Sequence, residues 1–206
     1  MQPEKKPRYV CHRCAKVSDT CCRLGSGGKS YSGADCFPLS DKERMSIENA
    51  LSKAKSKRLD AGSVLLLQSV AGAEDAPSGA AEWAVQEPNS PGFVKAMQNL
   101  FPKEKKRLAE VFQPEGSHLR LALTGDGSCV FLSEYGCTLP QQARPHFCRL
   151  FPFWVVSTVV QCFSDENCLA VQENGDNFIS LLGAFDVSAA ELRERYNTLR
   201  RDWGVD

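Results

Sequence analysis

The sequence predicts an α+β fold, in which several helices and a small antiparallel hairpin form a single compact domain over residues 1–206, with a cysteine-rich metal centre. Three observations lead to this prediction. Helix start signals precede apolar residues spaced three and four apart, alternating leucines lead into a glycine turn, and the ten cysteines of the 206-residue chain fall into two groups. A chain of this length can bury a hydrophobic core.

The first predicted helices begin at residues that favour helix starts. Ser40 and Glu43 can form a capping box, in which each side chain bonds the backbone N–H of the other residue. The face that follows carries Ile47, Ala50, Leu51, Ala54 and Arg58. A second helix starts at Pro91, and its apolar stripe is Phe93, Met97, Leu100 and Phe101. A third helix is predicted to open at Pro102.

Residues 118–132 are predicted to form a β-hairpin. Leu119, Leu121 and Leu123 alternate toward one face, residues 125–127 supply a turn, and residues 129–132 return. This hairpin would present Cys129 and, just beyond it, Cys137.

The remaining chain predicts strands, a loop and a last helix. Residues 64–70 favour a short strand, and residues 71–81 favour an exposed, flexible loop because they are rich in Gly, Ala, Ser and Pro. Residues 153–163 are rich in valine and aromatic residues, which favours one buried strand. The region 187–204 predicts a helix that starts at a Ser188–Glu191 capping box and buries Leu192, Tyr196, Leu199 and Trp203.

Composition argues against several classes of protein. The 25 basic and 25 acidic residues cancel, so no overall field attracts nucleic acid or anionic lipid. No stretch approaches the ~20 apolar residues that span a bilayer, and the N-terminus lacks a secretory signal. A glycine turn at residues 25–30 lacks the preceding strand of a phosphate loop. We therefore expect a cytoplasmic protein, with a protein partner left open.

The N-terminal region 9–37 contains cysteines with metal-ligand spacing. Cys11 and Cys14 form a Cys-x-x-Cys knuckle, in which a short turn holds both sulfurs on one side. Cys21 and Cys22 follow after six residues. Buried or disulfide-bonded cysteines are the alternative interpretation. Because adjacent side chains of an extended segment point to opposite faces, Cys21 and Cys22 are expected to serve different ligand sets.

The C-terminal cysteine region, residues 118–170, carries further motifs: the stretch from Asp126 to Leu132, Gly136-Cys137, and the run from Arg144 to Phe153. Together with the N-terminal cysteines, these motifs resemble the YkgJ-like cysteine-cluster family, which is described as a zinc- or iron-chelating domain. The resemblance runs from about Cys11 to Cys168. Its most specific part is the Arg-Pro-x-x-Cys-Arg-x-Phe-Pro piece.

The resemblance implies eight metal ligands, which could furnish two four-sulfur sites. They are Cys11, Cys14, Cys21, Cys22, Cys129, Cys137, Cys148 and Cys168. Cys36 and Cys162 do not match the family clearly. Arg144 and Arg149 flank Cys148 and are expected to contact the cofactor. His12 and His146 are alternative ligands.

Two chemical expectations follow. Cys148 is predicted to lie near the amide-rich end of a short helix, where the partial positive charge would lower its pKa and favour a thiolate. Sulfur ligands suit zinc or an iron–sulfur cluster equally. The predicted function is a metal-binding module. The alternative is an iron–sulfur enzyme that acts on a protein substrate, because some flagellin lysine N-methylases look like distant relatives of the family.

Overall fold

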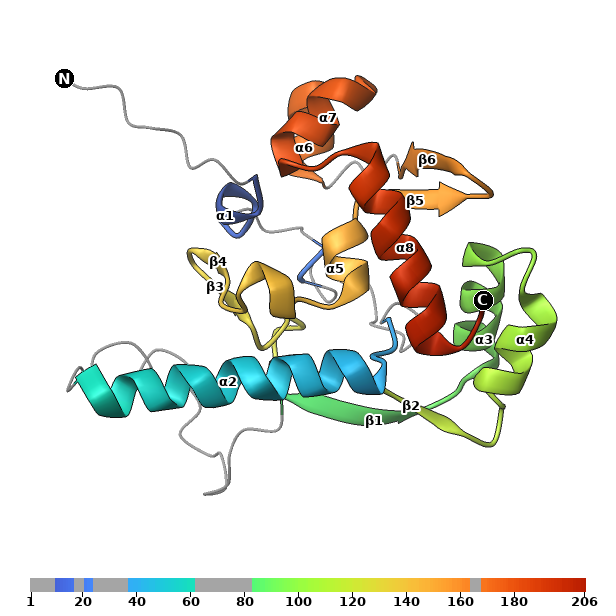
Figure 1. Ribbon diagram of the computed structural model, residues 1–206, viewed down its shortest axis with the longest axis horizontal. Helices are drawn as coiled ribbons and strands as arrows, with labels where there is room; N and C mark the ends of the chain where they lie inside the picture. The colour runs from blue at the N-terminus through green and yellow to red at the C-terminus, as the bar shows by residue number, and fades with distance from the viewer. Residues whose placement is uncertain (1–9, 17–20, 24–36, 62–82, 164–167) are drawn as a thin grey trace.

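The chain is described by a computed structural model (Figure 1) over residues 10–16, 21–23, 37–61, 83–163 and 168–206. The predictions for residues 25–30, 64–70 and 71–81, and for Cys36, lie outside these ranges. The elements in chain order are α1 (Val10–Cys14), α2 (Asp41–Ala61), β1 (Ala84–Pro88), α3 (Pro91–Leu100), α4 (Lys105–Val111), β2 (Ser117–Leu121), β3 (Leu132–Ser133), β4 (Gly136–Cys137), η3 (Gln141–Ala143), α5 (His146–Leu150), β5 (Phe153–Val156), β6 (Val159–Cys162), α6 (Leu169–Asn174), α7 (Phe178–Phe185) and α8 (Ala189–Trp203).

The predicted mixture of helices with small antiparallel sheets is confirmed. Within the described ranges the strands form three separate two-stranded sheets, β1–β2, β3–β4 and β5–β6. In Figure 1, α2 runs along one edge of the molecule, and α5 and α8 lie between it and the α6–α7 pair.

The start of α2 confirms the first capping box. The Ser40 backbone N–H and hydroxyl donate to Glu43 Oε2 at 2.7 and 2.8 Å, and the Glu43 N–H donates to Ser40 Oγ at 3.2 Å. Of the predicted face, Ile47 is fully buried against Phe131 and Leu139, whereas Ala50 and Leu51 are half-buried. This small second core packs α2 on the loop region that carries the C-terminal cysteines.

The second and third helices form much as predicted. Ser90 caps α3 by accepting a 3.0 Å hydrogen bond from the Phe93 N–H, and Phe93, Met97 and Phe101 are buried. Helix α4 begins at Lys105 and not at Pro102, because Pro102 and Lys103 form a turn after α3.

The predicted hairpin over residues 118–132 forms only next to its turn. Leu123 and Cys129 form an antiparallel bridge, flanked by the Thr124 N–H to Ser128 carbonyl and Val130 N–H to Ala122 carbonyl hydrogen bonds of 2.8 and 3.2 Å. The rest of the first strand, β2, pairs instead with β1, with Gln86 opposite Leu119. The inward residues are also different, since His118 and Ala122 are buried while Leu119 is only half-buried. His118 turns inward because its ring stacks on Phe93 at a centroid distance of 3.8 Å.

Residues 153–163 form a hairpin and not a single strand. Strand β5 turns at Ser157, whose φ is 60°, and returns as β6, with Val155 opposite Val160. Phe153, Trp154 and Val155 are buried, but Val156 and Val159 are exposed at the tip. The prediction of one buried strand is therefore confirmed only for the first half of the segment, β5.

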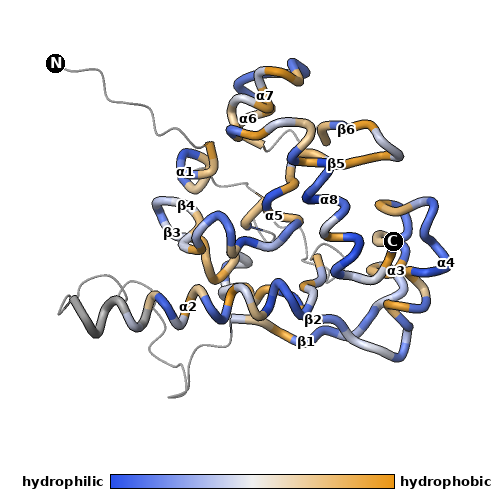
Figure 2. Tube along the Cα trace, in the orientation of Figure 1, coloured by the Kyte–Doolittle hydropathy of each residue, from blue (hydrophilic) through white to orange (hydrophobic). Residues whose placement is uncertain are grey.

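The main core lies under α8. The stripe of Leu192, Tyr196, Leu199 and Trp203 is buried, as predicted, and the Ser188–Glu191 capping box is present. The Phe101 ring lies 5.4 to 5.8 Å from those of Trp154, Tyr196 and Trp203, so α3, β5 and α8 share one aromatic cluster. Figure 2 shows α8 as mostly polar residues interrupted by apolar ones, and mostly apolar residues along β5 and β6.

Candidate functional site

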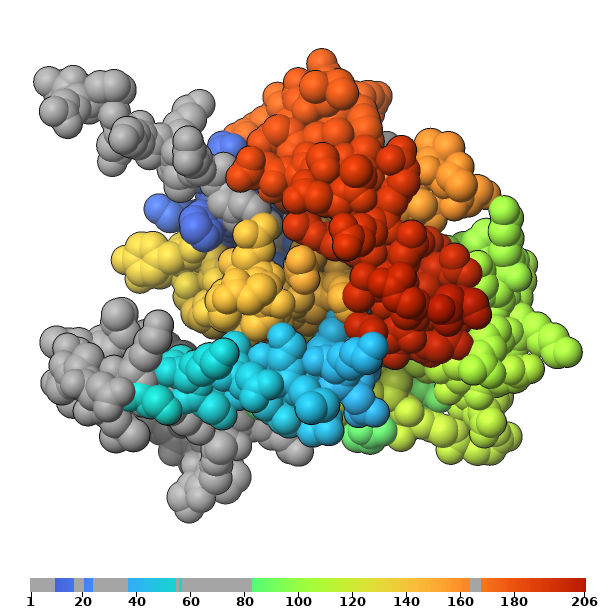
Figure 3. All heavy atoms as spheres, in the orientation of Figure 1, coloured from blue at the N-terminus to red at the C-terminus, as the bar shows by residue number. Residues whose placement is uncertain are grey.

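Helix α1 lies against the β3–β4 hairpin and brings the first two cysteines close to Cys137. Gly136 has a φ of 100°, and a Cβ at this position would lie 2.9 Å from His12 Cδ2 and 3.3 Å from His12 Cα. Only glycine permits such an approach in this backbone conformation. Figure 3 shows the atoms of α1 lying beside those of β3 and β4. Cys11 and Cys14 are one helical turn apart, so they share a face of α1.

The segment of residues 21–23 is held by the loop that contains Cys129. The Cys129 N–H donates a 2.8 Å hydrogen bond to the Cys22 carbonyl oxygen, and Arg23 forms an isolated bridge with Ser128. These backbone contacts join residues that are more than 100 positions apart in the sequence. They hold the N-terminal cysteine segment against the C-terminal cysteine region.

The thiols of Cys21 and Cys22 interact with each other. The Cys21 thiol hydrogen-bonds to Cys22, which, with burial and the charges of Cys22, Cys11 and Cys148, raises the pKa of Cys21 well above its usual range. The same hydrogen bond, with the positive charges of Arg144 and Arg23, lowers the pKa of Cys22 against the opposing effect of burial. Cys21 and Cys22 lie in a turn and not in an extended segment, so the extended geometry assumed for them is not present. Their assignment to different ligand sets stays a prediction.

Cys148 lies among other thiols. Burial raises its pKa well above the usual range, and negative charges at Cys22, Cys129 and Cys137 raise it further. The predicted low pKa is therefore wrong. Helix α5 has only five residues, and the end of so short a helix does not offset the loss of solvation and the neighbouring thiolates. Cys21 and Cys148 both retain exposed surface, so the loss of solvation that raises their pKa values is incomplete.

We call this group the thiol cluster: Cys11, Cys21, Cys22, Cys129, Cys137 and Cys148. Cys21, Cys22, Cys137 and Cys148 carry free thiols. Burial also raises the pKa of Cys137, whereas the positive charge of Arg144 opposes that rise. Each of these thiols is thus affected by a charged neighbour from a different part of the chain.

Arg144 lies beside two cysteines of the thiol cluster. Its Nε donates to the Leu139 carbonyl oxygen at 3.0 Å and its Nη2 to the Cys137 carbonyl oxygen at 3.4 Å, which keeps the guanidinium near Cys22 and Cys137. The predicted role of Arg149 at the cofactor stays a prediction. Arg23 was not singled out in the sequence, although its charge does act on Cys22.

Cys168 is in a different setting. It is buried at the N-cap of α6, and its charge acts on Cys162, not on the shifted thiols of the cluster. Burial and the charges of Cys168 and Asp176 raise the pKa of Cys162 to about 11. A salt bridge between Arg13 and Glu173 ties helix α1, which carries Cys11 and Cys14, to α6, whose N-cap is Cys168.

His146 forms a structural contact with Asp202 on α8. Its Nε2 lies 3.0 Å from Asp202 Oδ2, and Lys42 Nζ lies 2.7 Å from Asp202 Oδ1. Burial raises the pKa of Asp202, but the hydrogen bonds from Lys42 and His146 lower it overall. Residues two positions apart in a helix are separated by about 200° around its axis. His146 and Cys148 are two positions apart in α5, so they lie on opposite faces of the helix. Asp202 and Lys42 were not predicted, since neither is near the cysteine motifs in sequence.

No group of three or more His, Cys, Asp and Glu side chains in the described ranges is arranged to hold a metal ion. The thiol cluster is therefore a set of neighbours and not an assembled metal centre. Comparison of the chain with protein-family models, curated proteins and solved structures gave no match. The resemblance to the YkgJ-like family stays a prediction from the motifs. Among the described helices, none is both long and apolar enough to cross a membrane.

Proposed function

We propose that the protein is a metal-binding module that binds zinc or iron, the latter as an ion or an iron–sulfur cluster, through cysteines from both halves of the chain. The observation that best supports this proposal is the effect of Cys22, Cys129 and Cys137 on the Cys148 thiol. Sulfur atoms from three chain segments are thus near enough to oppose one another's ionisation.

The donor chemistry suits a soft metal ion. Four thiolates are the usual ligand set of a structural zinc ion and of an iron–sulfur cluster. Cys22, Cys129, Cys137 and Cys148 would supply one such set. Cys11, Cys14, Cys21 and Cys168 are the further predicted ligands, available for a second site beside the first.

Metal binding would overcome the electrostatic cost of ionising these thiols. Each raised pKa means that the protein favours a neutral thiol while no cation is bound. A bound metal would displace the protons and compensate the negative charges. Because sulfurs of one zinc site lie about 4 Å apart, given bonds of ~2.3 Å, binding would draw the thiols closer together.

The two arginines beside the cluster would stabilise the loaded site. Four thiolates around one zinc ion carry a net charge of about −2, which nearby cations offset. Arg144 and Arg23 already lower the pKa of Cys22, so their charges act on one of the proposed ligands.

Anaerobic preparation of the full chain followed by elemental analysis and visible absorption tests the proposal. We expect at least one equivalent of zinc or iron, and iron–sulfur binding would give a brown protein. Cys148→Ala should lower the metal content by about one equivalent, while the matched control Cys162→Ala should not. Folded protein that contains neither zinc nor iron, and binds neither when reduced, would rule the proposal out.

A further inference from the structure

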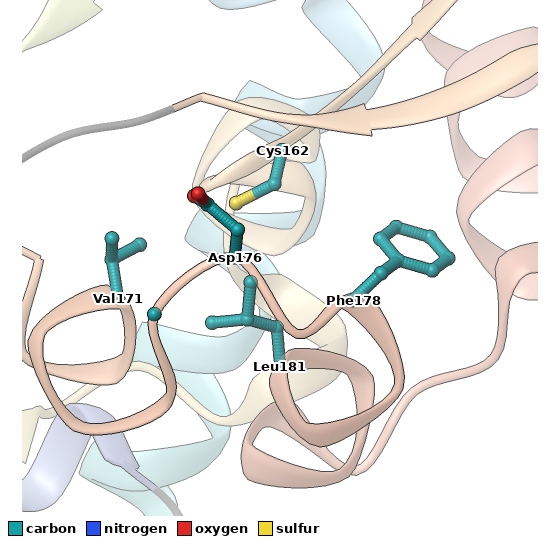
Figure 4. A pocket seen from close by; sticks show the side chains of 6 residues that line it. Cys162, Val171, Asp176, Phe178 and Leu181 are labelled. Atoms are coloured by element: carbon teal, nitrogen blue, oxygen red, sulfur yellow. The ribbon is translucent and has the colours of Figure 1, made fainter.

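A cavity of about 210 Å³ lies away from the thiol cluster, between strand β6 and the turn that joins α6 to α7 (Figure 4). Its lining residues are Cys162, Val171, Gly175, Asp176, Phe178 and Leu181. At ≈30 Å³ for each water in the liquid, the volume equals that of about seven waters. The cavity therefore suits a small molecule and not a large cofactor.

Three apolar side chains, those of Val171, Phe178 and Leu181, line one part of the cavity. Leu181 is 1% exposed and forms the floor, while Val171 and Phe178 are half-buried. A Cβ built on Gly175 would meet no atom within 4 Å, so the wall is open at this residue. A ligand with a short hydrocarbon body could therefore enter beside Gly175 and displace water from apolar surface.

The polar groups at the cavity are Asp176 and Cys162, which Figure 4 shows close together on the same side. The Cys162 thiol donates a 3.4 Å hydrogen bond to the Phe163 carbonyl oxygen and remains neutral near pH 7. Within the described ranges, Asp176 takes part in no salt bridge. The carboxylate of Asp176 is therefore the charged group that the cavity offers to a ligand.

We propose that this cavity binds a small primary alkylammonium compound, with its ammonium group at Asp176 and its alkyl chain against Val171 and Leu181. The combination of one carboxylate with the apolar side chains of Val171, Phe178 and Leu181 selects a monocation over an anion or a neutral polar molecule. The cavity is separate from the proposed first metal set of Cys22, Cys129, Cys137 and Cys148, none of which lines it.

The test is a titration of the full chain with n-butylammonium, followed by NMR of the Val171 and Leu181 methyl groups. We expect saturable shifts of these methyl signals in the millimolar range. n-Butanol, which has the same heavy-atom count without the charge, should bind about threefold more weakly, as expected for one solvent-exposed ion pair.

Two variants separate the proposed site from general charge effects. Asp176→Asn should remove the preference for butylammonium over butanol. Asp186→Asn is the matched control, because Asp186 is an exposed carboxylate at the opposite end of α7, in a left-handed conformation that asparagine tolerates. Val171→Phe should weaken both ligands by filling the cavity. Absence of saturable methyl shifts, or equal effects of the two Asp→Asn variants, would overturn the proposal.

Discussion

The His146 backbone N–H donates a 2.6 Å hydrogen bond to Glu43 Oε1, which joins the first turn of α2 to the first turn of α5 across 103 residues of sequence. The other carboxylate oxygen of Glu43 completes the capping box with Ser40. One buried side chain therefore starts two helices, and the second of them carries Cys148.

Replacement of Glu43 by alanine should destabilise the protein by about 3 kcal/mol, because a helix cap and a charge-assisted hydrogen bond are lost together. Glu43→Gln should cost less, since an amide oxygen still accepts one of these bonds. Urea unfolding measures both effects. Glu48→Gln is the control, because Glu48 forms only a partly exposed salt bridge with Arg44 on the same helix. Equal stability of the Glu43 and Glu48 variants would contradict this prediction.

His118 should make the protein less stable as the pH falls. Burial lowers the pKa of His118. The negative charge of Glu87 acts against this effect, and the positive charge of Arg120 lowers the pKa further. The folded protein therefore binds the proton less readily than the unfolded chain. The stabilisation is present above the ordinary histidine pKa of about 6.5 and is lost as the pH falls toward the lowered value.

The measurement for His118 is the free energy of unfolding at about pH 7.5 and about pH 5.5. Wild type should lose more stability over this interval than His118→Gln, although the variant should be less stable at the higher pH because the stacking on Phe93 is lost. Identical pH slopes for the two proteins would show that His118 is not responsible.

Cys22 should be alkylated more readily than Cys162 in the metal-free, reduced protein. Its pKa is lowered, whereas that of Cys162 is raised to about 11. Iodoacetamide labelling at neutral pH, followed by peptide mass spectrometry, should therefore modify Cys22 well before Cys162, because the thiolate is the reactive form.

Arg144→Gln should slow the labelling of Cys22 by about twofold to tenfold, since it removes one of the positive charges that favour the thiolate. Arg107→Gln serves as a control, because Arg107 interacts with Glu110 and Gly204. A rate at Cys22 that does not depend on Arg144 would contradict the electrostatic account of this site.

Cys148→Ala should lower the melting temperature of the metal-loaded protein by about 5–10 °C, because a ligand that binds only the folded state stabilises it by mass action. Complete chelation of the wild type should produce a similar decrease. Cys162→Ser should have a smaller effect. A wild-type melting curve that does not change after full metal removal would show that metal binding and folding are not linked.

Local patterns in the sequence predicted the helices well, because each pattern specifies its own hydrogen bonds. The capping boxes of Ser40 and Ser188 formed, and the stripe that ends at Trp203 is buried. Strand pairing was predicted less well. A single sequence contains the alternation of residues 118–123 but not the identity of the partner strand, and β1 took the place that residues 129–132 were expected to fill.

The sequence by itself determined which residues could bind a metal, since thiol chemistry and spacing are local properties. Only the tertiary structure decided which thiols are neighbours and what charge they favour. The Cys129–Cys22 backbone hydrogen bond, the Glu43–His146 contact and the position of Arg23 each join segments distant in sequence. Burial and neighbouring charges set a thiol's pKa, and both are properties of the packed chain. For that reason Cys148, expected to favour a thiolate, favours a neutral thiol instead.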